Sequence, residues 1–334
     1  GFRSFFNSRS LTSIVTQQLI FKGVKMNVIE VKHLTKDYGH GRGVFDVSIE
    51  VKEGEVFGFL GPNGAGKSTT IRHLMGFSAP DSGSVTIFDK ETFNKYDEIL
   101  DKVGYIPGEI ALPQGLTGYE FLDMIKNMRH EKKAILFTEL LSLFKVDDTM
   151  LKTDTKRMSL GEKRKLAIVA AFMNDPDVLI LDEPTSGLDP VMQNVFIDYI
   201  LKEKTRGKTI LLSSHIFSEI DATCDRIAII KDGKVVSTFV ADELKHAKRK
   251  YYNIVFSKDE EKEAFLSQIN EIPSFILLNK SEKEIMMSIE DSDLNMVVRL
   301  LSKYKIVLFS NHKESLQDYF MKFYKEEKDF KGAL

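Results

Sequence analysis

The residues that point most directly to chemistry are nine in a row, 61–69. They read Gly61-Pro62-Asn63-Gly64-Ala65-Gly66-Lys67-Ser68-Thr69 and fit G-x-x-x-x-G-K-[ST], the pattern of a phosphate-binding loop. Glycines there let backbone N–H groups converge on phosphates at a helix N-terminus, where the helix dipole favours anions. Lys67 would neutralise the β- and γ-phosphates, and the Ser68 hydroxyl would ligate Mg²⁺. The run therefore predicts a site for a nucleotide and Mg²⁺.

Two acidic residues after another apolar run are the next candidates. Residues 178–181 are continuously apolar, which is typical of a buried strand, and Asp182-Glu183-Pro184 follow directly. Charge at the end of a buried strand lies where metal and water chemistry takes place in α/β sheets. Asp182 is then placed to hold the Mg²⁺ shell, and Glu183 to orient or deprotonate an attacking water. A pair that only caps the next helix is the alternative.

Three single residues have both a functional and a structural interpretation. Tyr38 follows the first predicted strand, and its ring either stacks on a nucleotide base or packs locally. Ser159 opens a helix with Glu162 three residues on, a spacing that predicts a capping box. His215 comes just past the predicted strand 209–213, where it is either functional or an ordinary polar residue.

Strands and helices that could position these residues are visible along the chain. Residues 56–60 read as a buried strand before the loop, and residues 69–75 as the start of a helix after it. Residues 26–32 and 44–51 alternate as strands do. Helices and strands alternate from 54 to 230, which predicts a parallel sheet covered on both faces. Within that range, residues 113–174 change to helical periodicity and form a predicted helical subdomain.

The C-terminal part has a different order of elements. A hairpin of residues 226–230 and 234–240 turns at Asp232-Gly233. A basic helical link, 244–250, follows it. Residues 251–326 then read strand, helix, strand, strand, helix, strand, helix, of which the first six form the split βαβ arrangement of a small α+β domain.

Length and composition bound the possible classes of protein. With 334 residues the chain is long enough for two domains, predicted as 26–243 and 244–334. Lys+Arg 47 against Asp+Glu 49 gives no sign of a nucleic-acid partner. One cysteine, Cys224, excludes an internal disulfide. No apolar run approaches the roughly 20 residues that span a bilayer, so any membrane crossing falls to another chain.

Residues 1–25 differ in composition from the rest. They precede Met26, contain no acidic residue and are rich in Ser and Thr, a composition that is similar to a mitochondrial transit peptide. The interpretation we favour is a non-native or upstream segment, disordered, with Met26 as the natural start.

Taken together, these stretches resemble the ATP-binding subunit of an ABC transporter, closely over 26–240 and more loosely beyond. The order of the motifs makes the resemblance specific: the phosphate loop, the helical insertion, Met158-Ser159-Leu160-Gly161-Glu162, then Leu179-Ile180-Leu181-Asp182-Glu183-Pro184, Ser186-Gly187-Leu188-Asp189 and His215. The resemblance implies an α/β P-loop NTPase domain of the ABC type with a helical subdomain, followed by the smaller α+β domain.

Roles follow from this resemblance position by position. Tyr38 would stack on the adenine of ATP, and His215 would bind the γ-phosphate and steady the water. Ser159 and Gly161 match the family signature L-S-G-G-Q, which closes over the ATP of the other protomer. Hydrolysis would then require a homodimer or a paired ABC subunit. Asp189 would communicate between the two sites.

Two departures from the family pattern stand out. Leu160 and Glu162 replace the first Gly and the Gln of the signature, which we expect catalysis to survive. The family normally places a Gln where Gly108 stands, a residue that touches Mg²⁺ and relays the ATP state to the membrane partner. The neighbouring Glu109 is the candidate replacement, since Gln114 lies too far along the chain.

The single nucleotide domain and the C-terminal domain are most similar to exporter subunits of the drug, bacitracin and lantibiotic-resistance type. Such subunits work with a separate six-helix permease, of the ABC-2 type, on the cytoplasmic inner face of the cell membrane. The resemblance implies ATP and Mg²⁺ as cofactors and a drug, peptide or other amphiphile as cargo. The alternative is a non-transport ABC ATPase acting on ribosomes or DNA. It is disfavoured by a single phosphate loop and the lack of sustained heptads or cysteine pairs.

Overall fold

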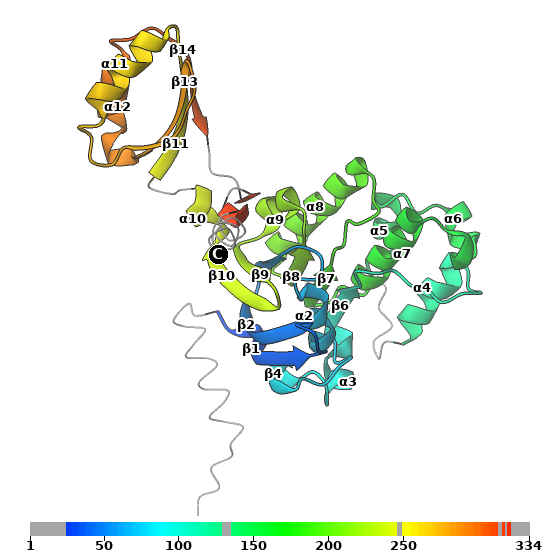
Figure 1. Ribbon diagram of the computed structural model, residues 1–334. Helices are drawn as coiled ribbons and strands as arrows, with labels where there is room; N and C mark the ends of the chain where they lie inside the picture. Colours follow the sequence, from blue (N-terminus) through cyan, green and yellow to red (C-terminus); the bar gives the residue numbers. More distant parts are fainter. Residues whose placement is uncertain (1–24, 129–134, 246–248, 313–315, 318, 322–334) are drawn as a thin grey trace, which may run out of the picture. The chain divides into compact units, whose positions relative to one another are not determined.

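The computed structural model describes residues 25–128, 135–245, 249–312, 316–317 and 319–321. The chain divides between Phe239 and Val240 into two compact units. The first unit contains two sheets and the helices around them, and the second is a smaller α/β unit (Figure 1).

A six-stranded sheet forms the centre of the first unit, in the order β10-β9-β3-β8-β7-β6. Strands β9, β3, β8, β7 and β6 pair in parallel. Every residue of β3, β7 and β8 is buried, as expected for strands with helices on both faces. The strands are β3 (Val56–Leu60), β6 (Val103–Ile106), β7 (Val178–Asp182), β8 (Thr209–Ser214), β9 (Arg226–Lys231) and β10 (Lys234–Val240).

A four-stranded antiparallel sheet, in the order β2-β1-β4-β5, lies beside it. It consists of β1 (Asn27–Asp37), β2 (Gly43–Lys52), β4 (Ser82–Ile87) and β5 (Lys90–Glu91). Strand β4 corrects the prediction of one parallel sheet from 54 to 230, because it pairs antiparallel with β1. The physical reason is its alternation: Val85 and Ile87 face the core that β1 shares, while Ser84 is exposed.

Helices of the first unit cover the parallel sheet and form the predicted helical subdomain (Figure 1). Thr117 caps α4 through a capping box with Glu120, and Phe121 and Leu122 bury its inner face. The range 113–174, predicted to be helical, contains α4, α5, α6 and α7, and residues 129–134 within it lie outside the described residues. The helices are α2 (Lys67–Leu74), α3 (Tyr96–Ile99), α4 (Gly118–Asn127), α5 (Phe137–Leu143), α6 (Asp148–Lys152), α7 (Leu160–Phe172), α8 (Pro190–Thr205) and α9 (Phe217–Thr223).

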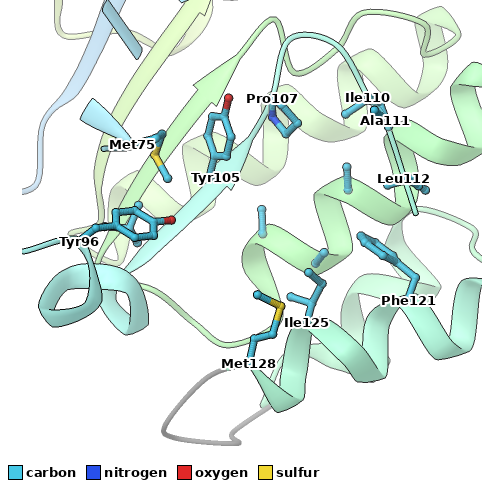
Figure 2. A pocket seen from close by; sticks show the side chains of 14 residues that line it. Met75, Tyr96, Tyr105, Pro107, Ile110, Ala111, Leu112, Phe121, Ile125 and Met128 are labelled. Carbon is cyan, nitrogen blue, oxygen red and sulfur yellow. The ribbon is translucent and has the colours of Figure 1, made fainter. Parts of the chain in front are cut away.

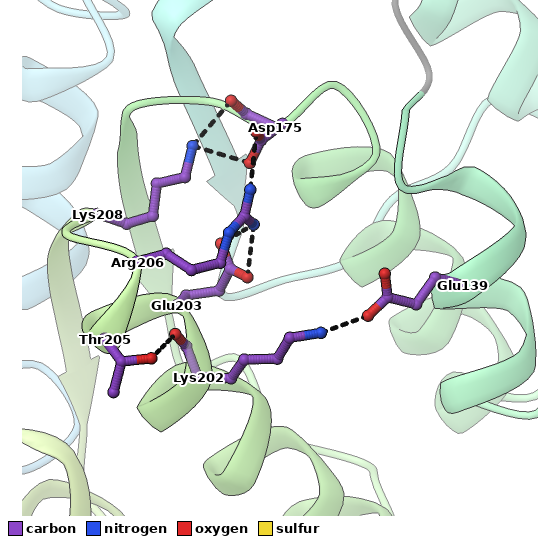
Figure 3. Close-up of polar contacts among 7 residues, drawn as sticks. All are labelled: Glu139, Asp175, Lys202, Glu203, Thr205, Arg206 and Lys208. Atoms are coloured by element: carbon purple, nitrogen blue, oxygen red, sulfur yellow. Dashed lines mark hydrogen bonds and ion pairs between the residues drawn. The ribbon is translucent and has the colours of Figure 1, made fainter.

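An ionic network fixes the C-terminal end of α8 (Figure 3). Arg206 Nη1 lies 2.9 Å from Oε1 of Glu203, and its Nη2 lies 2.9 Å from Oδ2 of Asp175, just before β7. Lys208 adds a second cation, 2.8 Å from Oδ1 of Asp175. A separate pair, Lys202 with Glu139, joins α8 to α5 at 2.5 Å.

The second unit has the predicted split βαβ arrangement. Its sheet has the order β12-β13-β11-β14, with all three pairs antiparallel. Two helices pack on one face through an apolar core of their own. The elements are α10 (Ala241–Lys245), β11 (Arg249–Phe256), α11 (Asp259–Ile269), β12 (Ile276–Lys280), β13 (Glu284–Glu290), α12 (Leu294–Leu301) and β14 (Ile306–His312). Of the predicted final helix, 313–326, the structure describes residues 316–317 and 319–321 as helical.

Candidate active site

The phosphate loop joins β3 to α2 at the carboxyl edge of the parallel sheet. Gly66 is the N-cap of α2 and has φ 110°, a conformation that is strained for any residue with a Cβ. Gly61 is restricted by space instead, since a Cβ there would lie 2.5 Å from the Ile230 carbonyl oxygen. The backbone of the loop therefore requires glycine at these two positions.

Lys67 is the centre of the polar contacts in the loop. Its side chain is 5% exposed, and Nζ donates hydrogen bonds to the carbonyls of Gly61 at 2.6 Å and Pro62 at 3.1 Å. The same Nζ lies 3.2 Å from Oε1 of Glu183. Within the described part of the chain, that carboxylate oxygen is buried and has no hydrogen-bond partner beyond this ion pair. A buried ammonium beside a buried, unsatisfied carboxylate oxygen is an arrangement suited to a further polar ligand.

Glu183 links the ends of two neighbouring strands, β7 and β8. Its φ is +48°, a strained value for a residue with a side chain, and its backbone N–H donates to the Ser213 carbonyl at 3.0 Å. Oε2 of Glu183 lies 2.6 Å from Nδ1 of the half-exposed His215. The structure thus brings Lys67, Glu183 and His215, which are far apart in sequence, to one place.

Asp182 is buried at the end of β7. Its Oδ1 accepts a hydrogen bond from the Ser213 hydroxyl. On its other side the loop after β6 approaches so closely that a Cβ at Gly108 would lie 2.9 Å from Oδ2. Gly108, which stands where the family carries a Gln, therefore places its backbone directly against the Asp182 carboxylate. Glu109 beside it is exposed.

The signature segment and the residues after Glu183 meet each other. Ser159 caps α7 through the predicted capping box, and its side-chain hydrogen bonds in the described part of the chain are with Glu162. A Cβ at Gly161 would lie 2.9 Å from the Gly187 carbonyl oxygen. Asp189 caps α8, accepting from the N–H groups of Val191 and Met192 at 3.0 Å. Ser159 itself is exposed.

Tyr38 lies directly after β1 with 47% of its surface exposed. Its backbone N–H donates to the Arg42 carbonyl at 2.9 Å, which closes the turn after the strand. The ring is therefore accessible.

Two buried residues at this site had no recognised signal in the sequence. Arg164 of α7 is 1% exposed, and Glu219 of α9 is 2% exposed. Oε2 of Glu219 accepts a hydrogen bond from the Ser214 hydroxyl at 2.6 Å. Burial raises the pKa of Glu219 to about 7, and the nearby Glu183 carboxylate adds to that shift. Arg164 bonds to segments distant in sequence, so no local motif marks it, whereas Glu219 lies five residues from its partner Ser214.

An apolar pocket of about 270 Å³ lies between the loop after β6 and helices α4 and α7 (Figure 2). Phe121 and Ile125 of α4 and Met128 directly after it line one side, and Tyr105 and Pro107 lie on the other. Its wall thus includes the same loop that carries Gly108.

The residues present fit a magnesium nucleotide better than a metal bound by protein alone. In the ranges that the structure describes, no group of three or more His, Cys, Asp or Glu side chains is arranged to hold a metal ion. Mg²⁺ in nucleotide sites takes most of its ligands from phosphates and water, with one or two from the protein.

None of the helices described is both long and apolar enough to cross a bilayer.

Comparison with known proteins also indicates a nucleotide-binding protein, of the ABC transporter family. The family model described as ABC transporter matches residues 44–186. The bacitracin transport ATP-binding protein BcrA of Bacillus licheniformis is 34% identical over 307 residues, which are 88% of this chain and 96% of that protein. The linearmycin resistance ATP-binding protein LnrL of Bacillus subtilis is 34% identical over 213 residues, 63% of this chain and 68% of that protein.

Solved structures agree with the fold. A structure described as the ATP-binding subunit of an ABC transporter is 31% identical, covers 66% of this chain and 92% of its own, and has a TM-score of 0.60. The ATP-binding cassette MJ0796, solved as a dimer bound to ADP and Pi, is 25% identical with a TM-score of 0.58. It covers 64% of this chain and 98% of its own.

A phosphate loop at the carboxyl edge of a parallel sheet, with a helical subdomain, defines a P-loop nucleotide-binding domain. Within that class, the chain belongs to the ABC transporter family, as an ATP-binding subunit that hydrolyses ATP for transport. Cassettes of this family dimerise. The alternative of an ABC ATPase acting on ribosomes or DNA is therefore set aside.

Proposed function

We propose that this subunit powers export of a drug, peptide or other amphiphile through a separate permease. The observation that carries the proposal is the extent of the match to the bacitracin transport protein, which includes most of the second unit as well as the cassette. The linearmycin resistance protein supports the same type of cargo. A bulky amphiphile is then the class of substrate that the permease would select.

For the site we propose that Glu183 is the general base and that His215 steadies the attacking water and the γ-phosphate. The 2.6 Å contact of His215 Nδ1 with Oε2 would hold this carboxylate in place. Lys67 would exchange its contacts with loop carbonyls for the phosphates of ATP. Ser68 and Asp182 would support Mg²⁺, which supplies charge stabilisation on the phosphates. Tyr38 would stack on adenine, while Ser159 and Gly161 would close over the ATP of the partner protomer and Asp189 would communicate between the sites.

Replacing Glu183 tests this assignment. Glu183→Gln removes the base but keeps the side-chain shape, so we expect ATP binding to persist and kcat for hydrolysis to fall at least about 100-fold. The variant should accumulate as an ATP-bound dimer, visible by light scattering. Glu260→Gln, an exposed acid of α11, is the control. Turnover near the wild-type rate would remove Glu183 from this role.

We further propose that the partner is an ABC-2-type permease, which would hold this chain at the inner face of the cell membrane. An apolar cytoplasmic segment of the permease would occupy the pocket beside the loop after β6. The support is its apolar lining and its shared wall with the loop that meets Asp182. Glu109, exposed on the same loop, is the proposed coupling residue.

Purification from gently solubilised native membranes tests the partner. We expect mass spectrometry to find a multi-span permease in about equal amount with the tagged chain. The identity of that permease would also narrow the cargo. Ribosomal or DNA-bound material without a membrane protein would overturn the proposal.

A further inference from the structure

Arg164 is a buried cation whose hydrogen bonds, among the residues that the structure describes, all go to backbone carbonyls. Its Nε donates to the Ser186 carbonyl at 2.9 Å, Nη1 to the Pro107 carbonyl at 2.9 Å and Nη2 to the Gly108 carbonyl at 2.8 Å. In the described ranges it forms no ion pair with a carboxylate. A planar guanidinium can serve three acceptors in fixed directions at once, which a lysine ammonium on a flexible stem cannot reproduce.

The two segments that Arg164 bonds to, residues 107–108 and the turn at Ser186, each lie next to one of the carboxylates of the proposed site. Gly108 lies against Asp182, where a Cβ would be 2.9 Å from Oδ2. Ser186 closes the turn that begins at Glu183, because its N–H donates to the Glu183 carbonyl at 3.1 Å. A shift of the guanidinium would therefore move the backbone beside each carboxylate.

The positive charge of Arg164 lies near three acidic side chains. Burial lowers the pKa of the guanidinium, whereas the carboxylates of Asp182, Glu183 and Glu219 oppose that change. Removing the cation would take one favourable charge away from these three acidic groups, of which Glu183 would keep its ion pair with Lys67.

We propose that Arg164 is a positioning residue that ties helix α7 to the loop 107–108 and to the turn 183–186, so that all three move as one body when ATP binds. This inference rests on the proposed site, in which Asp182 and Glu183 act on ATP. It gives the chain a link between the pocket-lining loop and the catalytic carboxylates that needs no side chain at position 108. Exposed Glu109 then acts at the surface of a loop that Arg164 holds from within.

Steady-state kinetics separate this role from general stability. In Arg164→Gln, which keeps two donors but loses the charge and the fork, we expect kcat to fall about 10- to 100-fold. The KM for ATP should stay within about twofold, because Arg164 does not touch the nucleotide site directly. Arg164→Lys keeps the charge without the fork, and should recover only part of the rate. Lys165→Ala, the next residue of α7, is the matched control.

Rates are counted per nucleotide-binding site, measured with a fluorescent ATP analogue, so that unfolded protein does not contribute. If Arg164→Gln does not fold, Arg164→Lys carries the test alone. A kcat equal to wild type in the folded variant, or a loss of rate matched by the rise in KM, would overturn the inference. If Glu183→Gln also hydrolyses ATP normally, the proposed site itself fails, and the two failures are thereby distinguished.

A probe on the loop tests the mechanical link itself. Cys224 is buried, and burial raises the pKa of its thiol to about 12, so an exposed cysteine introduced by Ala111→Cys can be labelled selectively. In a Glu183→Gln background we expect ATP to change the fluorescence of this label. Adding Arg164→Gln should abolish at least about two thirds of that change while ATP still binds. An unchanged response would show that the loop follows ATP by another route.

Discussion

Glu219 shows how a single buried carboxyl can make the stability of this protein depend on pH. The folded chain raises its pKa from 4.5 to about 7, chiefly through burial, so between these values the folded state retains a proton that the unfolded chain has released. The free energy of unfolding therefore receives a contribution that declines as pH rises from about 4.5 to 7 and is constant above that. Over the whole window the decline is about 3 kcal/mol.

Glu219→Gln should remove this dependence, because the amide has a similar shape and no titrating proton. We expect the free energy of unfolding of wild type, relative to the variant, to fall on going from pH 5 to pH 8. Urea unfolding followed by circular dichroism measures it, since the chain contains no tryptophan. The exposed Glu260→Gln provides the reference. A wild-type-to-variant difference that does not vary with pH would contradict the assigned pKa.

At the residue scale, the sequence predicts well what is local in the chain. The nine residues of the phosphate loop and the capping box of Ser159 each lie within one short segment, and the structure has the loop between strand and helix and the cap as expected. Arg164 bonds to residues 56 and 57 positions away, and its place in the charged run from Glu162 to Lys165 gives no sign that this one side chain is buried. Likewise, the close approach of Gly108 to Asp182 depends on two strands pairing.

At the element scale, the periodicity of the apolar residues predicted most strands and helices but not which sheet each strand joins. Strand β4 alternates as a half-buried strand does, whereas its place among alternating helices and strands favours the parallel sheet. In the second unit the order of elements alone predicts the split βαβ sheet that the structure has. Sheet membership is set by tertiary pairing, which has no local signal.

The end of α8 provides a test of what ion pairs contribute at this scale. Arg206→Ala would leave Glu203, 1% exposed, without its cation and take one partner from Asp175 (Figure 3). We expect the free energy of unfolding to fall by about 1–3 kcal/mol, because an uncompensated buried charge is costly. Solvent screening at the partly exposed Arg206 keeps the loss within this range.

The matched control lies one turn earlier on the same helix. Lys202 pairs with Glu139 across an exposed surface, so Lys202→Ala should cost less than about 1 kcal/mol. Urea denaturation of both variants at neutral pH makes the comparison. Equal losses would mean that burial of Glu203 does not set the strength of this network.

At the scale of the whole molecule, the proposed docking of a permease assigns a role to the apolar pocket beside the loop after β6 and to no other exposed apolar residues. Met128 at the pocket rim is 61% exposed, and Met296 on α12 of the second unit is 53% exposed. Met128 directly follows α4 and Met296 lies on α12, and because both side chains are mostly exposed, Met128→Glu and Met296→Glu should change stability little. A charge at Met128, however, would have to be desolvated against the apolar segment of the partner. We therefore expect Met128→Glu to reduce the permease recovered with the tagged chain at least about tenfold, with basal ATP hydrolysis unchanged, while Met296→Glu retains it. Equal recovery with both variants would place the permease elsewhere on the subunit and leave the pocket without its proposed partner.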